Sequence, residues 1–489
     1  MRPSPFQSAQ AWRRLAVALD CLTVYRQLSE LAVVKQLRQL LSQLAELLSE
    51  AEARPEQTRD RDRAQEPVTL LKLASVFYAD LLQEEPSGSW PAWLVRQLLL
   101  QENPFTAYLA AEPPSSGPAA QPDPYTAAVL ADQAMADLGV LQDLAQVDLG
   151  DIRLLLRQLL IASNQEWLLP LLQRLPEPDS ARLLPTPSVN AGVLPEACAL
   201  QQQLLSGIAQ PGSWAAALRQ LQQFHRTQGA GLTACYPALS LRQGQLAPLR
   251  RDLPPAAFDL LYDYSGNLSR LDQTIAGFVR GDFAHDILLT GPRGSGKSSA
   301  VRAVLPRYAG QGLRLIEVSP EALEQLNTWL PRLSRQAQHF ILLLDDLSFS
   351  DAGPEYHQLK RLLEGGLAER GSNILICATS NRRHLLAESG DPESSARFAE
   401  DERDERLSLA DRFGLHLTFR QPLQSEYLAI IRYLAVSRGF AGSLEQLQQE
   451  ALVWSNRRAS RSPRIARQFI DDRLGQEQLP AAASPEARP

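Results

Sequence analysis

Residues 286–298, "DILLTGPRGSGKS", join a short apolar run to a glycine-rich segment and then to a helical pattern. Residues 291–298 of this stretch match the Walker A pattern G-x-x-x-x-G-K-[ST]. Glycines in such a loop let backbone N–H groups curl around phosphate oxygens, and the N-terminus of the next helix adds partial positive charge. Because the loop follows an expected strand and opens an expected helix, it predicts a nucleotide phosphate site rather than a turn with an exposed lysine.

Each position of this phosphate loop has an expected role. Lys297 can reach the β- and γ-phosphates, and the hydroxyl of Ser298 can bind Mg²⁺. The residues expected to contact the nucleotide are Gly291, Pro292, Arg293, Gly294, Ser295, Gly296, Lys297, Ser298 and Ser299. The loop therefore predicts a bound nucleotide with Mg²⁺.

A second stretch, "ILLLDD" at residues 341–346, ends an apolar run with two aspartates. Parallel sheets present ligand-binding groups at the carboxyl ends of their strands, so Asp345 is expected to hold Mg²⁺ with Ser298, as a Walker B aspartate. Asp346 either orients or deprotonates the attacking water, or caps the next segment. Its side chain is one methylene shorter than glutamate, and a displacement of ~1 Å can cost ~100-fold in rate, so slow hydrolysis is one expectation.

The second half of the chain alternates apolar runs with helical patterns, which predicts an α/β core with a buried five-stranded parallel sheet. The expected strands are 286–290, 313–319, 340–346, 373–380 and 415–419. Helical patterns follow at 424–438, 443–457 and 463–474, with Ser462 as the N-cap of the last. These three helices are expected to form a C-terminal lid.

The first half is rich in Leu, Gln and Ala and reads as mainly helical. Leucines between residues 28 and 48 recur at three- and four-residue spacing, which fits a helix-bundle core or a partner-binding surface. Residues 112–124 form a proline-rich loop, and 232–249 carry a weak hairpin signal. The predicted domains are a helical region at 1–250, a nucleotide-binding domain at 251–420, a lid at 421–475 and a disordered tail at 476–489.

The amino-acid composition limits the partners and the cellular location that are expected for the protein. The net charge of -6 gives no overall attraction to nucleic acid or acidic membranes, although a local basic patch remains compatible with it. Four widely separated cysteines match neither a disulfide framework nor a zinc site, which favours a reducing, cytoplasmic location. No stretch of about 20 uncharged apolar residues occurs, so no membrane span is expected.

The series formed by the phosphate loop, "ILLLDD", "ATSN", "DRF" and "SPRIARQF" resembles an AAA+ ATPase module. More narrowly, residues from about 230 to 472 resemble a bacterial AAA+ group known mainly as a domain of unknown function. Members of that group share Asp-Asp followed by Leu-Ser-Phe, so the resemblance implies that Asp346 is a feature of the group. At "LYDYSGN", residues 261–267, Tyr264 matches the group while Asp263 replaces a glycine.

The resemblance implies ATP as the nucleotide, and no guanine-specific N-K-x-D string occurs. It also implies a polar sensor at the tip of the strand that lies between the two motif-bearing strands. Asn381 in "ICATSN" is the candidate for this first sensor, with Thr379 and Ser380 as neighbouring alternatives. A turn asparagine is the structural alternative for Asn381.

AAA+ modules usually act as rings, so the resemblance implies a homo-oligomer in which an arginine completes the neighbouring subunit's site. Arg412 in "LADRFGL" is the candidate finger, with Arg382 and Arg383 as alternatives, or it pairs within its own chain. Arg464 takes the second sensor position in the last lid helix. The remaining arginines nearby form a basic patch or a solvated face: Arg457, Arg458, Arg461 and Arg467.

Two functions fit these features. The first is an oligomeric Mg-ATP hydrolase that remodels a protein or nucleic-acid partner held by residues 1–250. The alternative is a nucleotide-gated switch or scaffold with little or no turnover, in which ATP or ADP sets the exposure of residues 1–250. Both use the same site, and the rate of turnover separates them.

Overall fold

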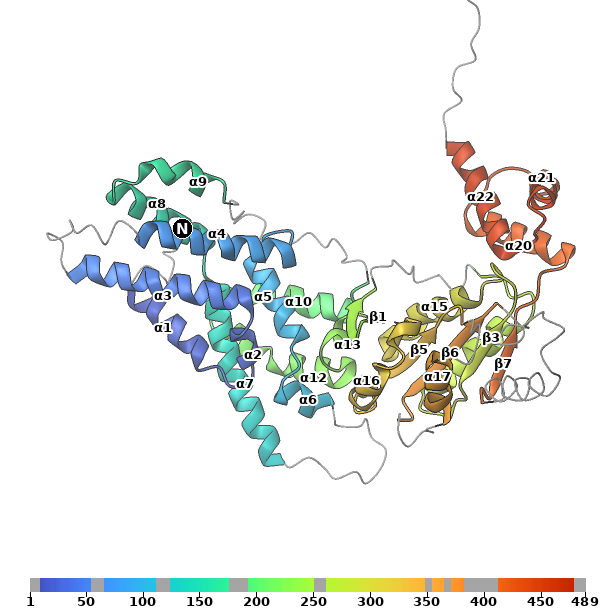
Figure 1. The fold of residues 1–489 in the computed structure, drawn as a ribbon, viewed down its shortest axis with the longest axis horizontal. Helices are drawn as coiled ribbons and strands as arrows, with labels where there is room; N and C mark the ends of the chain where they lie inside the picture. Colours follow the sequence, from blue (N-terminus) through green and yellow to red (C-terminus); the bar gives the residue numbers. More distant parts are fainter. Residues whose placement is uncertain are drawn as a thin grey trace, which may run out of the picture. The chain divides into compact units, whose positions relative to one another are not determined.

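The computed structural model describes residues 9–53, 66–110, 124–175, 192–249, 261–347, 354–364, 371–381 and 412–478. The chain divides into two compact units, Met1–Cys235 and Tyr236–Pro489. Figure 1 shows helices in the first unit and a sheet with helices in the second. Residues 112–123 of the proline-rich loop, Arg382, Arg383 and the tail after residue 478 lie outside the described residues.

The described part of the first unit is helical, as its leucine spacing predicts. Its helices are α1 (Ala9–Asp20), α2 (Arg26–Ser29), α3 (Ala32–Ala53), α4 (Glu66–Glu84), α5 (Trp90–Leu100), α6 (Pro104–Ala110), α7 (Pro124–Ala145), α8 (Leu149–Ala162), η2 (Glu166–Leu168), α9 (Leu169–Gln173), α10 (Pro195–Gly207), α11 (Ser213–Ala216), α12 (Leu218–Gln228) and α13 (Leu232–Cys235). Helix α3 packs against α1 and α4. The α3 leucines Leu37, Leu40, Leu41 and Leu44 are fully buried, so they belong to the core of a helix bundle.

Buried polar side chains tie distant segments of this unit together. Asp137 on α7 accepts hydrogen bonds from the backbone N–H groups of Thr23, Val24 and Tyr25, at 3.0, 2.8 and 2.9 Å. Gln142, one turn further along α7, donates from Nε2 to three carbonyls of the α10–α11 connection. Both side chains are buried and satisfy backbone groups, so their role here is structural.

The second unit contains the five predicted parallel strands, and the α/β fold class is confirmed. These strands are β3 (Ile287–Thr290), β4 (Leu313–Val318), β5 (His339–Leu344), β6 (Ile374–Ser380) and β7 (Leu415–Thr418). They lie in the order β4-β5-β6-β3-β7 and every neighbouring pair is parallel. Nearly all their residues are buried, which explains their continuous apolar runs.

Two further strands extend the sheet. The hairpin signal near residue 240 is confirmed as β1 (Ala238–Arg242) and β2 (Gln245–Pro248), which pair antiparallel around a turn with positive φ at Gln243 and Gly244. Strand β1 also pairs in parallel with β4, so the sheet has seven strands and not five. The two units consequently divide at Cys235 and not near residue 250, because the hairpin's partner strand is remote in sequence and leaves no local signal.

The helices of the second unit follow the predicted pattern. They are α14 (Asn267–Val279), α15 (Lys297–Tyr308), α16 (Leu326–Leu333) and α17 (Pro354–Glu364), with the short turns η3 (Ala309–Gln311) and η4 (Pro320–Ala322), and the lid helices α20 (Gln424–Ser437), α21 (Leu444–Arg457) and α22 (Pro463–Gln478). The lid has its own buried cluster, which includes Tyr427, Ile431 and Phe469. The hydroxyl of Ser462 accepts the N–H of Ile465 at 3.4 Å, in agreement with its predicted capping role.

Two other properties concern the whole described chain. Along the residues that the structure describes, no helix combines the length and apolarity needed to cross a membrane. All four cysteines lie among these residues, and each is a free thiol.

Candidate nucleotide site

The order of three neighbouring strands assembles the candidate site. Strand β6 lies between β5, which leads to the two aspartates, and β3, which leads to the phosphate loop (Figure 1). The carboxyl ends of parallel strands meet at one edge of a sheet. The phosphate loop, Asp345 with Asp346, and Asn381 are therefore brought to the same edge from three separate parts of the sequence.

Gly291 opens the phosphate loop at a position that requires glycine. Its φ is +146°, and a Cβ there would lie 1.9 Å from the backbone oxygen of Phe419. Its N–H donates to the Ser380 carbonyl at 3.2 Å. The start of the loop is thus held between the end of β6 and the segment after β7.

The middle of the loop touches the lid. Gly294 has a φ of +78°, and its carbonyl accepts the backbone N–H of Arg464 at 3.3 Å. A Cβ on Gly294 would lie 3.2 Å from the Ser462 hydroxyl. The structure therefore brings the start of α22, with the exposed side chain of Arg464, next to the phosphate loop.

Lys297 lies inside the loop and is only 6% exposed. Its ammonium donates to the carbonyls of Gly291 and Pro292, at 2.7 and 3.1 Å, and to Asn381 Oδ1 at 3.0 Å. Burial lowers the pKa of Lys297, and the charges of Asp346 and Asp345 oppose that shift only in part. The lysine therefore already faces the tip of β6, where the polar groups of the site converge.

Asp345 is hydrogen-bonded through both of its carboxylate oxygens. Oδ1 accepts from the hydroxyl of Ser298 and from the Thr379 hydroxyl at 2.7 Å, and Oδ2 accepts from Arg302 Nη2 at 2.8 Å. Burial alone would raise the pKa of Asp345, but the hydrogen bonds from Ser298 and Thr379 and the positive charge of Arg302 outweigh it and hold this pKa below its usual value. The carboxylate is thus ionised and adjoins the Ser298 hydroxyl, as a magnesium pair requires.

Asp346 has a left-handed backbone, with a φ of +57°. Its N–H donates to the Thr379 hydroxyl at 2.9 Å, and its carboxylate accepts from the amide of Asn381. Arg293 lies 3.9 Å from its other oxygen, with both side chains largely in solvent. Because aspartate and asparagine tolerate left-handed backbone better than other side chains with a Cβ, this local geometry favours the shorter acid.

The three sensor alternatives at the end of β6 separate clearly. Thr379 bonds to Asp345 and to the N–H of Asp346, and the Ser380 hydroxyl donates to the Leu347 carbonyl at 3.0 Å. Asn381 alone of the three bonds to both Lys297 and Asp346. It has the connections that a sensor needs, whereas Thr379 and Ser380 hold the backbone after β5.

The remaining loop positions serve different purposes. Gly296, with a φ of +100°, precedes α15, and Ser299 on the first turn of that helix is exposed. The Ser295 hydroxyl is buried and has no hydrogen-bond partner among the described residues, which leaves it available to a bound phosphate. Of these two serines, Ser295 is buried within the loop and Ser299 is exposed to solvent.

Two residues of the site were not predicted. Arg302 on α15 bonds to Asp345 and, through Nε, to Glu317 Oε1 on β4 at 2.5 Å. Arg302 follows Ser298 by four residues, so both lie on one helical face, and this spacing is the signal that could have found it. Glu317 interrupts an apolar strand, which is a weaker signal.

Arg412 lies away from the phosphate loop of its own chain. It precedes β7, whose first residue Leu415 pairs in parallel with Ile287 at the start of β3. The phosphate loop follows the other end of β3. Arg412 is thus at the amino ends of the strands, and the structure does not bring it to the site within one subunit.

The other lid arginines are mostly solvent-facing with local contacts. The guanidinium of Arg458 lies 4.2 Å from the centroid of the Trp454 ring, and it donates to Gln468 at 2.9 Å. Arg457 and Arg467 are exposed. These contacts fit the solvated-face interpretation of this arginine group.

The donor set fits Mg²⁺ with a phosphate ligand. A hydroxyl and an ionised carboxylate are the hard oxygen ligands that Mg²⁺ takes, and it completes its shell with water and phosphate oxygens. Among the described residues, no three His, Cys, Asp or Glu side chains gather closely enough to hold a metal by themselves.

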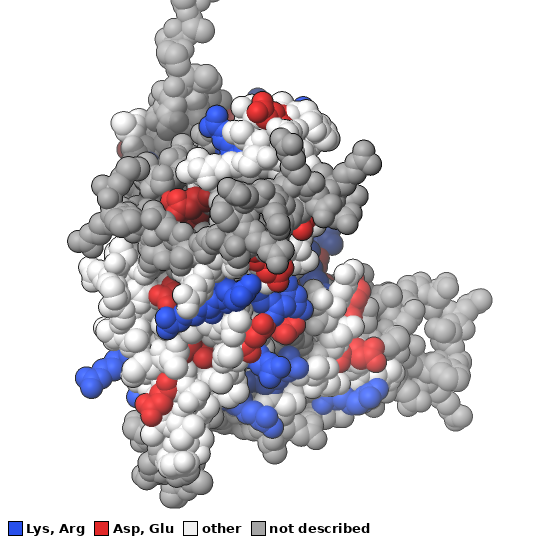
Figure 2. All heavy atoms as spheres, turned by 90° about the vertical axis from the view of Figure 1, so that its left-hand side faces the viewer, with Lys and Arg blue, Asp and Glu red and all other residues white. Residues whose placement is uncertain are grey.

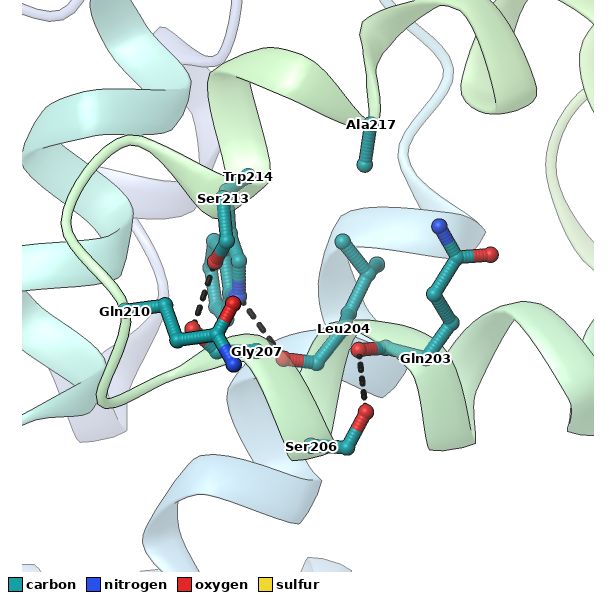
Figure 3. A pocket seen from close by; sticks show the side chains of 8 residues that line it. All are labelled: Gln203, Leu204, Ser206, Gly207, Gln210, Ser213, Trp214 and Ala217. Carbon is teal, nitrogen blue, oxygen red and sulfur yellow. Dashed lines mark hydrogen bonds between the residues drawn. The ribbon is translucent and has the colours of Figure 1, made fainter.

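A pocket in the helical unit has a different character (Figure 3). It has a volume of about 190 Å³ and lies between α10, α11 and the turn that joins them. Its polar groups bond to one another: Trp214 Nε1 donates to the Leu204 carbonyl at 2.9 Å, and the Ser213 hydroxyl to the Gly207 carbonyl at 2.5 Å. Its lining has no acidic, basic or thiol side chain, so it offers no chemistry of its own.

Solved structures resemble part of this chain. A variant of RuvB from Thermotoga maritima has 16% identity and a TM-score of 0.33, over 46% of this chain and 67% of that one. The Orc1 protein of Aeropyrum pernix, solved in complex with DNA, has 19% identity and a TM-score of 0.31, over 46% and 65%. A DNA replication initiation factor has 14% identity and a TM-score of 0.29, over 47% and 66%.

Family membership rests on the sequence of the second unit. No curated protein matches the chain. A family model described as "Protein of unknown function (DUF815)" matches residues 235–477, almost the whole described part of the unit that contains the sheet. Residues 235–477 therefore form a domain of the DUF815 family.

Proposed function

We propose that this protein is a Mg²⁺-dependent ATPase that hydrolyses ATP as an oligomer and uses the lid to act on a partner. The observation that carries the proposal is the contact between the Ser298 hydroxyl and ionised Asp345 at the mouth of the phosphate loop. Lys297, Asn381 and Asp346 adjoin this pair in one connected set. A glycine-rich turn without a ligand would have no need of this arrangement.

The proposed roles follow from the contacts. The backbone N–H groups of the phosphate loop and Lys297 bind phosphate oxygens, and Ser298 with Asp345 would hold Mg²⁺, which neutralises phosphate charge when bound. Asp346 orients the attacking water, and Asn381 holds Asp346 in place. ATP is assigned as the nucleotide by the resemblance to AAA+ modules.

Assembly into an oligomer is proposed from the position of Arg412. This arginine is exposed at the amino ends of the strands, whereas the phosphate loop is at their carboxyl ends. A neighbouring subunit can supply the arginine that the same chain does not bring to its own phosphate loop. An arginine provided in this way is worth roughly 10³–10⁵ in rate in related phosphoryl-transfer systems.

The partner is proposed to bind residues 1–250. On the face that Figure 2 shows, basic and acidic side chains are interspersed among uncharged ones. Nucleic acid is bound by surfaces on which basic residues gather. This face therefore favours a protein partner over nucleic acid.

A nucleotide-gated switch is the second candidate. Asn381 holds both Lys297 and Asp346 in the structure, and the acid at 346 has the shorter side chain. Binding of a phosphate must separate these groups before water can be activated. Slow turnover with a large change at the loop would favour this second function.

Steady-state phosphate release with Mg²⁺-ATP, measured across protein concentrations, tests the proposal. We expect specific activity to rise with concentration, and Asp346→Asn and Arg412→Ala each to lose at least ~10-fold, because each removes one group from the reaction. Asp346→Asn suits this test because asparagine keeps the left-handed backbone. Lys297→Ala gives the background. ATP binding without turnover above that background would reject hydrolysis and support the switch.

A further inference from the structure

Arg302 bridges two carboxylates beside the candidate magnesium pair. Its Nε donates to Glu317 Oε1 at 2.5 Å and its Nη2 to Asp345 Oδ2 at 2.8 Å. The side chains of Arg302 and Glu317 are only 18% and 17% exposed. Because water is largely excluded, these pairings are stronger and better fixed than pairs on an open surface.

The two oxygens of Asp345 have different neighbours. Oδ1 accepts from the hydroxyls of Ser298 and Thr379, and Oδ2 is held by Arg302. The proposed function assigns Ser298 and Asp345 to Mg²⁺. The guanidinium thus holds the oxygen that faces away from Ser298.

Glu317 fixes the guanidinium in this position. It lies on β4 and pairs in register with Leu343 of β5, two residues before Asp345. The planar guanidinium presents several N–H donors in a rigid fork, so it can hold both carboxylates in one geometry. Rotation of Asp345 would break a bond that Glu317 helps to keep in place.

We propose that Arg302 is a positioning residue that makes the site selective for Mg²⁺ over Ca²⁺. By holding Oδ2, it limits Asp345 to one-oxygen ligation through Oδ1. Mg²⁺ accepts single oxygens in a strict octahedron, whereas the larger Ca²⁺ takes six to eight oxygens and often binds both oxygens of a carboxylate. This inference rests on the proposed Mg²⁺-nucleotide function and adds the origin of its metal preference.

Nucleotide binding in the two metals provides the test, without need of turnover. The affinity of the full-length protein for a fluorescent ADP is measured in Mg²⁺ and in Ca²⁺, and the ratio of the two affinities is the readout. We expect Arg302→Gln to lower the Mg²⁺/Ca²⁺ ratio by on the order of 10-fold, because partners that orient metal ligands typically contribute 10–100-fold in metal affinity. Arg302→Lys keeps the positive charge but loses the planar fork of N–H donors, so its Mg²⁺/Ca²⁺ ratio should lie between those of Arg302→Gln and the wild type.

Charge and geometry are separated by a second variant. Arg302→Gln removes a positive charge and Glu317→Gln removes a negative one, so an effect of charge alone moves nucleotide affinity in opposite directions and leaves the metal ratio unchanged. The positioning role predicts that both variants lower the ratio. Arg307→Gln is the matched control, because Arg307 lies on the same helix and pairs with Asp272 at 3.0 Å.

The outcomes are distinct. An unchanged ratio in Arg302→Gln and Glu317→Gln, with thermal unfolding like that of the wild type, overturns the positioning role and leaves the proposed ATPase intact. If neither Mg²⁺ nor Ca²⁺ changes the nucleotide affinity of the wild-type protein, the proposed function and this inference are both overturned. A lowered ratio in both variants, with Arg307→Gln unchanged, supports the inference.

Discussion

The two units of this protein satisfy their buried polar side chains with different kinds of partner. In the helical unit, Asp137 and Gln142 bond to backbone groups of other segments, and His225 bonds to the carbonyl of Gly229 at the end of its own helix. All three side chains have almost no contact with solvent. In the nucleotide-binding unit, Asp345 bonds to the side chains of Ser298, Thr379 and Arg302. Lys297 bonds to the Asn381 side chain as well as to two carbonyls of the phosphate loop. Polar groups satisfied by backbone hold a fold together, whereas polar groups that satisfy one another can exchange partners when a ligand arrives. This difference separates the structural role of Asp137 in the helical unit from the proposed metal-binding role of Asp345 in the other unit.

The largest effect is expected at Asp137. Asp137→Ala leaves the N–H groups of Thr23, Val24 and Tyr25 without their acceptor, which should lower the free energy of unfolding of the helical unit by about 3–5 kcal/mol. Denaturant unfolding followed by tryptophan fluorescence measures this change. Asp137→Asn keeps an acceptor oxygen and should lose less. Nucleotide affinity should stay the same in both variants, and its loss would contradict the division of roles.

His225 should make the helical unit sensitive to acid. Burial lowers its pKa from 6.5 to about 4, and its Nε2 has no hydrogen-bond partner among the described residues. Since the folded pKa is below the unfolded one, the unfolded chain takes up the proton first as the pH falls. The contribution to stability is complete above about pH 6.5, and about 3 kcal/mol is lost by pH 4.

Urea unfolding at pH 7 and pH 4.5 checks this contribution. The wild type should lose more stability between the two conditions than His225→Gln, which has no group to titrate at this position. Equal losses in the two proteins would show that His225 is not the buried, neutral residue of the structure.

Two glycines, one from each unit, should respond in opposite directions. Gly291→Ala places a Cβ against the Phe419 carbonyl at positive φ, which should cost about 1–3 kcal/mol and abolish nucleotide binding. Gly139 lies within α7, and a Cβ there has no atom within 4 Å. Gly139→Ala should stabilise the helical unit by about 0.5–1 kcal/mol. Thermal unfolding with an ADP-binding assay tests both, and an unaltered ADP affinity in Gly291→Ala would disprove the tight loop geometry.

The smallest destabilising effect is expected at Asp346. Asp346→Glu puts a longer side chain on a left-handed backbone, which should cost about 1 kcal/mol, or about 2–4 °C in melting temperature for a unit of this size. Asp346→Asn should melt like the wild type. If Glu is as stable as Asn, the backbone does not explain the choice of aspartate.

Much of the site could be predicted because its signals are local. The glycines, Lys297 and Ser298 lie within eight consecutive positions, and Asp345 and Asp346 directly follow an apolar run. Continuous apolar runs and a period of about four residues are local properties of the sequence, so they predict the strands and the three C-terminal helices. Signals within single stretches of the sequence are therefore enough to predict the α/β class, the phosphate loop and the pair of aspartates.

How these parts meet could not be predicted from the sequence and is known from the folded chain. The addition of β1 and β2 to the sheet, the bond of Arg302 to both Glu317 and Asp345, and the position of Arg412 at the far ends of the strands all depend on pairing between segments distant in the chain. The left-handed backbone of Asp346 likewise depends on Thr379, which holds its N–H from a neighbouring strand. Register and packing fix such contacts, and neither is encoded in a single stretch of sequence.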